Sequence, residues 1–231
     1  MNIKILNLIE GAKEAKGVAV IIDVFRAFSV ECYIMDKKPK VLYACGDKTL
    51  AYNYKNEHKD ALLVGERHGV MLEGFNYGNS PSQLENADLY NKTIIHTTSA
   101  GTQGIENAIN ADVILTGSLV NAKAIAEYIK RNRFKEVSLV GMGIETLYEA
   151  EEDTLCALYI KSLLEDKPLL DMDERIEHLK STTGKKFFDP LQQNVFPKDD
   201  FRLSTDLNRF NFVLKVERRA DGLNIVKRID L

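Results

Sequence analysis

The sequence lacks three features that would assign it to a special class of protein: paired cysteines, a long apolar run and an excess of one charge. Its three cysteines, Cys32, Cys45 and Cys156, are widely spaced and odd in number. This spacing excludes a disulfide framework and a zinc finger, and it favours a reducing, cytoplasmic setting. No apolar run approaches the roughly 20 residues that span a bilayer, and the N-terminus lacks the layout of a signal peptide. We therefore expect no membrane partner.

The charges of the chain nearly cancel. Lys and Arg number 31 and Asp and Glu 34, for a net charge of −3. Because the basic residues are interleaved with acids, the clustered basic patch of a nucleic-acid-binding protein is absent, and we expect no nucleic-acid partner. A content of 45% hydrophobic residues excludes a disordered chain. The length of 231 residues allows one large domain or two small ones, and α/β folds of this size are often single domains.

Short apolar runs alternate with helical patterns along most of the chain. Unbroken Val- and Ile-rich runs favour strands buried on both faces of a parallel sheet. Apolar residues at i, i+3, i+4 and i+7 from Ala122 predict a helix, and a longer helix is expected from about Tyr148 to Glu165. The alternation predicts an α/β fold with a mostly parallel, doubly wound sheet. The runs are 18–22, 61–64, 93–95, 113–115 and 137–140.

The pattern changes after Pro168. A polar helix is expected over 171–182. Residues 210–216 and 223–229, with Asp-Gly in the intervening turn, predict a terminal antiparallel hairpin. Since no low-complexity linker is present, we interpret 1–231 as a single domain whose residues 185–231 form a C-terminal extension.

The first buried run ends in an acid. Ligands bind beyond the carboxyl ends of strands in open α/β sheets, and Asp23 and Arg26 would lie there together. The alternative is a helix N-cap Asp beside a surface Arg. A haloacid-dehalogenase-type phosphatase would need a second acid two residues after Asp23, and Phe25 occupies that position. This disfavours that class.

A long loop rich in Gly, Asn and Ser follows the second run. Glu66 and Arg67 come directly after the strand, and the loop continues through Asn79 and Ser80. Long loops in compact domains are usually functional, although a solvated loop with turn-forming glycines is the simpler alternative. His68 is more readily explained as a solvated loop residue than as a catalytic one.

Small hydroxyl residues and glycines follow the run 93–95. Backbone N–H groups at such a turn, where a helix begins, favour a bound anion. The absence of Gly-Lys-Ser/Thr excludes a P-loop, and ordinary helix capping is the alternative. The residues expected to contact the anion are Thr97, Thr98, Ser99, Gly101 and Thr102.

Two later strand ends offer further candidates. Ser118 is expected as a helix N-cap, and Ser118 and Asn121 could also meet a ligand. Glu152 and Asp153 open the long helix, where the helix dipole favours acids. Asp153 shares a helix side with apolar residues, so its carboxylate needs a partner such as a divalent cation. Cys156 is expected to pack in the core.

Taken in order, these segments form a set of motifs. They read Val-Ile-Ile-Asp-Val-Phe-Arg-Ala, Gly-Glu-Arg, Gly-Phe-Asn-Tyr-Gly-Asn-Ser-Pro, Thr-Thr-Ser-Ala-Gly-Thr, Ser-Leu-Val-Asn-Ala and Glu-Asp-Thr-Leu-Cys-Ala-Leu-Tyr-Ile. Over about residues 18–165 the chain resembles the 2-phosphosulfolactate phosphatase (ComB-like) family. The resemblance implies a three-layer α/β/α fold and Mg2+-dependent hydrolysis of 2-phosphosulfolactate to 3-sulfolactate and phosphate, a step toward coenzyme M.

The resemblance also implies roles for individual residues. Arg26 and the Thr97–Thr102 loop would bind phosphate, and Arg67 would bind the sulfonate or carboxylate of the substrate. The expected catalytic residues are Asp23, Arg26, Glu66 and Asp153. The expected metal ligands are Asp23, Glu66, Glu152 and Asp153. The expected substrate-binding residues are Arg67, Asn79, Ser80, Thr97, Thr98, Ser99, Gly101, Thr102 and Asn121.

Several alternatives stay open at this point. The substrate could be another small phosphorylated hydroxy acid, or the chain could bind an anion without turnover. Either a water or Asp23 itself could attack phosphorus. A homo-oligomer is not excluded. In each case the convergence of acids and arginines at one sheet edge predicts a small, highly anionic partner.

Overall fold

Ten strands form one mixed sheet in the computed structural model, which describes residues 1–231. The most buried strands are the apolar Val- and Ile-rich runs, because a strand covered on both faces needs no polar side. In β2 (Gly17–Ile22) every side chain after Gly17 is buried. The other strands are β1 (Asn2–Asn7), β3 (Val41–Ala44), β4 (Leu62–Arg67), β5 (Val70–Met71), β6 (Thr93–Thr97), β7 (Ala111–Gly117), β8 (Glu136–Gly141), β9 (Phe212–Glu217) and β10 (Asn224–Asp230).

The C-terminal hairpin joins two groups of parallel strands. The order across the sheet is β1-β8-β2-β7-β9-β10-β3-β6-β4-β5. Strands β1, β8, β2 and β7 pair in parallel, as do β3, β6 and β4. Strands β9 and β10 pair antiparallel with each other and with β7 and β3 on either side. The predicted hairpin is thus confirmed, and it occupies the middle of the sheet.

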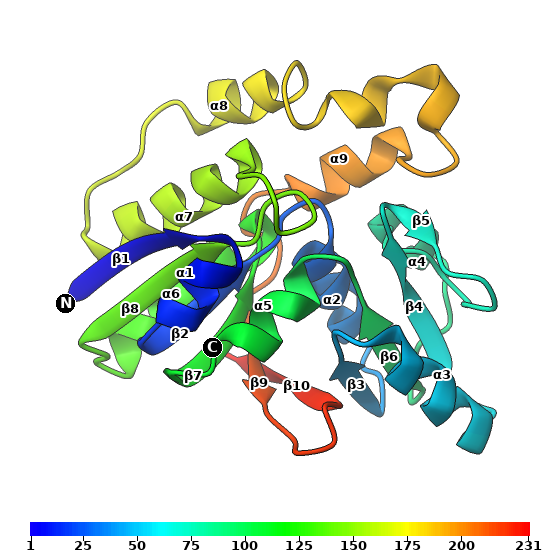
Figure 1. Ribbon diagram of the computed structural model, residues 1–231. Coiled ribbons are helices and arrows are strands. Elements are labelled where there is room, and N and C mark those ends of the chain that lie inside the picture. Colours follow the sequence, from blue (N-terminus) through cyan, green and yellow to red (C-terminus); the bar gives the residue numbers. More distant parts are fainter.

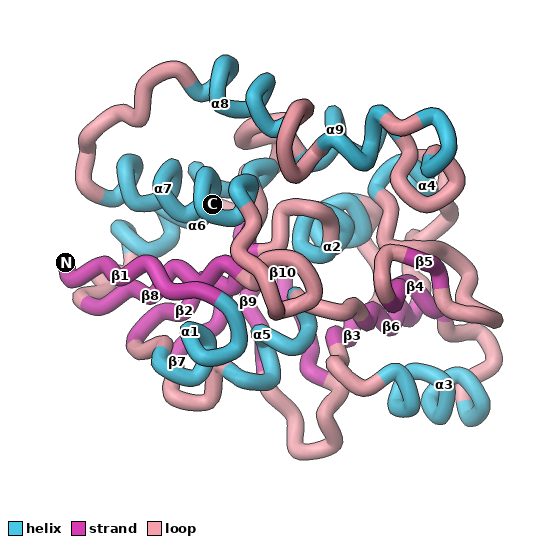
Figure 2. The backbone as a smooth tube through the Cα atoms, turned by 45° about the horizontal axis from the view of Figure 1, so that its top comes forward, coloured by secondary structure: helices cyan, strands magenta, loops and turns pink.

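Helices cover both faces of the sheet, as Figure 1 and Figure 2 show. The face predicted from Ala122, Ile125, Ala126 and Ile129 is buried, and the predicted long helix begins at Glu151. The helices are α1 (Leu8–Glu14), α2 (Ala27–Asp36), α3 (Lys48–Glu57), α4 (Pro81–Leu84), α5 (Gly101–Asn107), α6 (Ala122–Arg131), α7 (Glu151–Leu164), α8 (Met172–Leu179) and α9 (Lys198–Ser204). Three short 3-10 turns are η1 (Leu119–Asn121), η2 (Lys185–Phe188) and η3 (Pro190–Gln192).

Alternate residues of β2 face two separate hydrophobic clusters. Ala19 and Ile21 pack in a cluster that includes residues of α1, α2 and α5. Val18, Val20 and Ile22 pack in a second cluster with residues of α6 and α7. A strand buried on both faces in this way requires a layer of helices on each side. The predicted α/β class with a three-layer arrangement is confirmed.

The segment from α8 to α9 lies across the carboxyl ends of the strands, at the top of Figure 1. Phe187 and Phe201 anchor it in a small apolar cluster with Leu155 and Leu179. Residues of the loops after β2, β4, β6 and β8 line one cavity together with residues of this segment. The carboxyl ends of both strand groups therefore meet beneath one cover.

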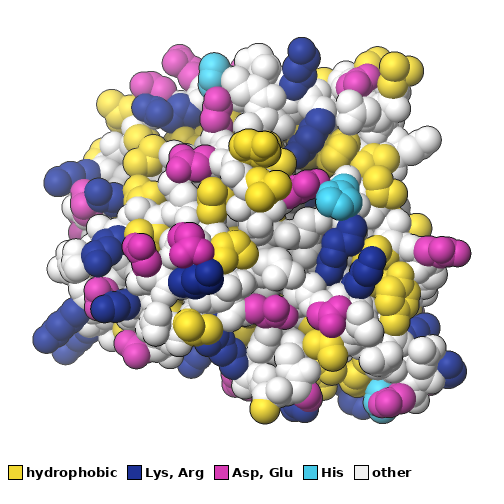
Figure 3. All heavy atoms as spheres, in the orientation of Figure 1, with side chains coloured by type: hydrophobic (Ala, Val, Ile, Leu, Met, Phe, Trp, Pro, Cys, Tyr) yellow, Lys and Arg dark blue, Asp and Glu magenta, His cyan; other side chains and the backbone are white.

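The surface carries both signs of charge in mixture. On the face shown in Figure 3, Lys and Arg side chains alternate with Asp and Glu, and no extended patch of one sign appears. None of the helices has both the length and the apolar character needed to pass through a bilayer.

Candidate active site

A cavity of about 230 Å³ lies beneath the cover, at the carboxyl ends of β2, β4, β6 and β8. These strands belong to both parallel groups, so the cavity depends on the way the hairpin joins them. Its walls combine acids, cations and backbone from segments distant in sequence. The lining residues are Asp23, Phe25, Arg26, Glu66, His68, Gly69, Asn79, Ser99, Ala100, Gly143, Ile144, Glu145, Glu152, Asp153, Thr183, Lys186 and Phe196.

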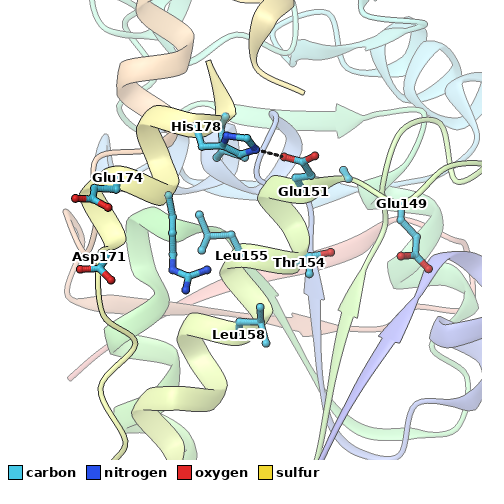
Figure 4. Close-up of a pocket in the computed structure, with 11 residues that line it drawn as sticks. Glu149, Glu151, Thr154, Leu155, Leu158, Asp171, Glu174 and His178 are labelled. Atoms are coloured by element: carbon cyan, nitrogen blue, oxygen red, sulfur yellow. Dashed lines mark ion pairs between the residues drawn. The ribbon is translucent and has the colours of Figure 1, made fainter. Parts of the chain in front are cut away.

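A larger groove of about 570 Å³ lies between α7 and α8 (Figure 4). Leu155 and Leu158 form its apolar part, and the His178–Glu151 ion pair, at 3.7 Å, crosses one end. None of the segments that follow β2, β4 or β6 reaches this groove. We therefore assign the chemistry to the smaller cavity, where buried charges of both signs converge.

Asp23 leaves β2 at the base of the cavity. Its Oδ1 accepts a hydrogen bond of 3.1 Å from the backbone N–H of Ala27. Burial, followed by the neighbouring Glu66 and Glu152, raises the pKa of Asp23 to about 6. Its Oδ2 lies beside Gly101, where a Cβ would come within 3.0 Å of that oxygen. Gly101 thus permits the approach of α5 to Asp23.

Two acids hold the loops around the cavity in place. Asp153 accepts from the backbone N–H groups of Val24 (2.9 Å) and Gly143 (2.8 Å). Glu66 accepts from the N–H of Ser99 (2.7 Å) and from Gly69 (2.6 Å). Each carboxylate therefore ties two strand-end loops together. Burial and the charges of Glu152 and Asp23 raise the pKa of Asp153 well above its usual range.

Glu152 and Lys186 are the least satisfied charges of the cavity. Oε2 of Glu152 and Oγ1 of Thr183 are buried without a hydrogen-bond partner. Burial raises the pKa of Glu152, while the nearby Thr183 and Lys186 oppose that shift. Burial also lowers the pKa of Lys186, against the attraction of Glu152. Lys186 lies 5.2 Å from the ring centre of Phe196.

The donors in this cavity fit a hard cation such as Mg2+. The cavity offers carboxylate oxygens, and Mg2+ is usually held by one or two carboxylates together with waters and substrate phosphate. Glu152 Oε2 is buried without a hydrogen-bond partner, and Oδ2 of Asp23 lies beside the glycine at the start of α5. No group of three or more His, Cys, Asp or Glu side chains lies close enough to hold an ion on its own. The fit is therefore to an ion that keeps several waters.

Arg26 lines the cavity but is tied to the cover. Its guanidinium forms a buried ion pair of 2.6 Å with Asp200 of α9 and donates to the carbonyl of Val195. The ring of Phe196 lies 4.9 Å from its Cζ. Asp200 also accepts from the hydroxyl of Ser80. The charge of Arg26 is thus balanced within the protein before any anion binds.

The cavity contains seven of the residues that the sequence predicted for the site. These are Asp23, Arg26, Glu66, Asn79, Ser99, Glu152 and Asp153. The residues placed outside its lining are Arg67, Ser80, Thr97, Thr98, Gly101, Thr102 and Asn121.

The outlying residues have partners within the protein. Arg67 donates to the carbonyl of Gly46 and to Oγ1 of Thr97. Thr98 and Thr102 bond each other through hydroxyl and backbone, which orders the turn before α5. Oδ1 of Asn121 accepts from the N–H of Ser118, at 3.3 Å, the contact expected where the η1 turn begins. The roles predicted for these residues in binding substrate remain predictions.

Four further residues at or beside the cavity are not predicted from the sequence: Lys186, Thr183, Phe196 and Asp200. All four lie after the region of recognised motifs, in a stretch with no strand end to mark them. A possible signal was the pair Phe187-Phe188 beside Lys185-Lys186, since aromatic residues next to lysines are unusual in a solvated connection.

Comparison with known proteins agrees with the motifs. A family model described as 2-phosphosulpholactate phosphatase matches residues 3–218. A protein of Bacillus subtilis (strain 168), named probable 2-phosphosulfolactate phosphatase, is 29% identical over 203 residues, which is 87% of this chain and 88% of that protein. One of the same name from Carboxydothermus hydrogenoformans is 34% identical over 176 residues, or 76% of this chain and 72% of that protein. The chain belongs to the 2-phosphosulfolactate phosphatase family, a family of phosphoric monoester hydrolases.

Proposed function

We propose that this chain hydrolyses 2-phosphosulfolactate to 3-sulfolactate and phosphate with the help of Mg2+. The observation that carries the proposal is the cavity itself, where the pKa values of Asp23, Glu152 and Asp153 are all raised. Like charges held together at low dielectric favour a bound cation. Family membership supplies the substrate named for the relatives.

The substrate is a small molecule with phosphate, sulfonate and carboxylate groups. Lys186 is the cation of the cavity without a carboxylate partner at ion-pair distance, so we assign it to the phosphate oxygens. Asn79 and Ser99 supply further polar groups from the opposite loops. Arg26 would contribute its positive field, because Asp200 already holds its guanidinium.

Asp23 and Glu152 would hold Mg2+, with waters completing its shell. Bound there, the ion would neutralise charge on the phosphoryl group and lower the pKa of a water. The pKa of Asp23 is raised to about 6 by burial and by its acidic neighbours, so a cation held at its Oδ2 would stabilise the ionised carboxylate. Asp153 and Glu66 act by fixing the loops that carry Gly143, Ser99 and Gly69.

Asp23 could instead attack phosphorus directly. A single turnover in ¹⁸O-labelled water followed by mass analysis separates the two routes. Label in the carboxylate of Asp23 supports a covalent intermediate, because hydrolysis of the acyl phosphate by attack at carbon leaves ¹⁸O on the protein. If water attacks the acyl phosphate at phosphorus, no label enters the protein. Phosphoprotein trapped by rapid acid quench is therefore the second readout.

A substrate screen tests the proposed function. Purified protein is assayed for phosphate release from 2-phosphosulfolactate, phosphoglycerate and phospholactate, with Mg2+ and with a chelator. We expect phosphate release only when Mg2+ is present, with the highest kcat/KM for 2-phosphosulfolactate. Equal rates on all three esters would overturn the substrate, and full activity in chelator would overturn the metal. Phosphate binding without turnover of any ester would favour a simple anion-binding protein.

A further inference from the structure

A buried polar network lies behind the cavity, and Asn79 is its one member with a part in the proposed function. Glu31 of α2 and His96 of β6 are both completely buried, with Nδ1 of His96 3.1 Å from Oε1 of Glu31. The hydroxyl of Thr116 in β7 donates to Oε2 of Glu31 at 3.2 Å. On its other side, Nε2 of His96 lies 3.3 Å from Oδ1 of Asn79. The network thus connects the core to the cavity wall.

The network joins three elements through side chains. Glu31 belongs to α2, His96 to β6, and Asn79 to the loop just before α4. Both ring nitrogens of His96 are engaged, Nδ1 with Oε1 of Glu31 and Nε2 with Oδ1 of Asn79. Rotation of the ring would break both contacts, so His96 is fixed between its two partners.

Asn79 is the one member of the network that reaches the cavity. Its amide has an acceptor and a donor end, and the two ends can exchange by a half-turn of the side chain. With Oδ1 bound to His96, Nδ2 lies at the other end, and it makes no hydrogen bond to another protein group. The donor end is therefore left for an anion in the cavity.

We propose that Glu31 and His96 are positioning residues that hold Asn79 with its Nδ2 toward the cavity, where the amide donates to an anionic oxygen of the ligand. This inference requires only that the cavity bind inorganic phosphate. The identity of that anion as the phosphate of a substrate rests on the proposed function.

Replacing Glu31 by Gln keeps the size but puts an amide where two carboxylate oxygens face Nδ1 of His96 and the hydroxyl of Thr116. We expect the ring and the Asn79 amide to lose their fixed orientation, so that Glu31→Gln weakens the binding of inorganic phosphate by about tenfold or more, the loss expected for a hydrogen bond to a charged group. In the assay KM should rise while kcat changes little, because the lost contact is present before and during the reaction. Glu127→Gln, a change at a half-buried position of α6, is the matched control and should alter neither value.

A double-mutant cycle separates positioning from general structural damage. If Glu31 acts through Asn79, then Glu31→Gln causes no further loss of phosphate affinity once Asn79 is Ala. Independent and additive losses in the double variant would overturn the proposal. Isothermal titration with inorganic phosphate supplies the affinities, so a failure of the substrate screen does not affect this test.

Wild-type protein supplies a second test that needs no altered network. The chain has four histidines, and His58, His68 and His178 are exposed. Replacing each exposed histidine by Gln assigns its ¹⁵N signals, and the remaining pair belongs to His96. We expect these two signals to move when inorganic phosphate is added, because Asn79 connects the ring to the cavity. Signals that stay in place at saturating phosphate would overturn the proposal, even if Glu31→Gln does not fold.

Discussion

At the scale of single residues, the acids of the cavity are in conflict with their surroundings. Asp23, Glu152 and Asp153 are all buried, and burial is the largest cause of each raised pKa. Glu152 also has a buried oxygen with no partner. Such an arrangement lowers the stability of the protein without metal, and it leaves oxygens ready for a cation. Stability and function are therefore opposed at these residues.

Asp23→Asn should show how much the buried carboxylate lowers the stability of the metal-free protein. The folded-state pKa of Asp23 is about 6 against the ordinary 3.8, so the folded protein holds an extra proton between these values. The free energy of unfolding of metal-free wild type should fall as the pH rises through this window, by about 3 kcal/mol for Asp23 alone. Asp23→Asn should lack this part of the decrease in the free energy of unfolding. At pH 8 in chelator the variant should therefore be more stable than wild type.

Urea unfolding at pH 4 and pH 8 measures this difference. Asp112→Asn, an exposed change, should keep the pH dependence of wild type. Added Mg2+ should raise the Tm of wild type more than that of Asp23→Asn, and phosphatase activity should be lost in the variant. Identical pH dependence in Asp23→Asn and wild type would contradict the burial argument.

Lys186 provides a second prediction for a single residue. Lys186→Met keeps much of the packing against Phe196 and removes the cavity cation that has no carboxylate partner at ion-pair distance. We expect kcat/KM to fall about 100-fold, in the range found when one preorganised electrostatic partner is removed. Steady-state kinetics measure the effect, and Lys185→Met, on the exposed neighbour, should retain wild-type values. Equal losses in both variants would argue against a specific role for Lys186.

At the scale of elements, one buried ion pair fastens the cover to the sheet. Asp200 of α9 is fully buried, and it binds Arg26, Ser80 and the backbone N–H of Ser82. Arg26 lies just before α2, and Ser80 just before α4. One carboxylate thus joins three helices around the cavity. The position of Lys186, which belongs to the same cover, depends on this attachment.

Asp200→Ala should weaken the attachment strongly. Removing one member of a buried ion pair leaves the other charge uncompensated, a loss of about 3–5 kcal/mol. Chemical unfolding should therefore show a clear decrease in stability, together with lower activity. Asp199→Ala changes an exposed neighbour, and its stability should stay within about 0.5 kcal/mol of wild type. Comparable stability of the two variants would mean that Arg26 finds another partner.

At the scale of the whole molecule, the hairpin of β9 and β10 joins the two parallel strand groups into one sheet. Leu214 of β9 is fully buried and is paired with Thr116 of β7 and Arg228 of β10. Leu214→Ala should cost about 2–5 kcal/mol. Since β9 is central, hydrogen exchange should accelerate in both groups, for example in β2 and in β6.

The matched control is Leu191→Ala, because Leu191 is 94% exposed. Its exchange and its unfolding midpoint should equal those of wild type. If Leu214→Ala accelerated exchange only in β7 and β9, the two groups would be separate cooperative units, and the hairpin would only lie between them. Mass spectrometry of peptides from each strand distinguishes these results.

Local patterns determined much of this protein. Unbroken apolar runs specified strands buried on both faces, and the spacing from Ala122 to Ile129 specified a helix face, because both periods are properties of neighbouring residues. The rule that ligands bind at strand ends also placed Asp23, Glu66 and Asp153 at the cavity. The family motifs lie in the same strand-end segments.

Only the tertiary structure decided the rest. It placed the hairpin in the middle of the sheet, paired Arg26 with Asp200, and brought Lys186 within the electrostatic influence of Glu152. Each of these depends on contacts between residues far apart in the chain, and no local pattern records such a contact. The structure also shows which polar side chains are already used by the protein. Arg67, Thr98 and Thr102 form hydrogen bonds with protein groups outside the cavity. The sequence therefore determines the elements and the acids at their ends, and long-range packing decides which charges remain free to bind a ligand.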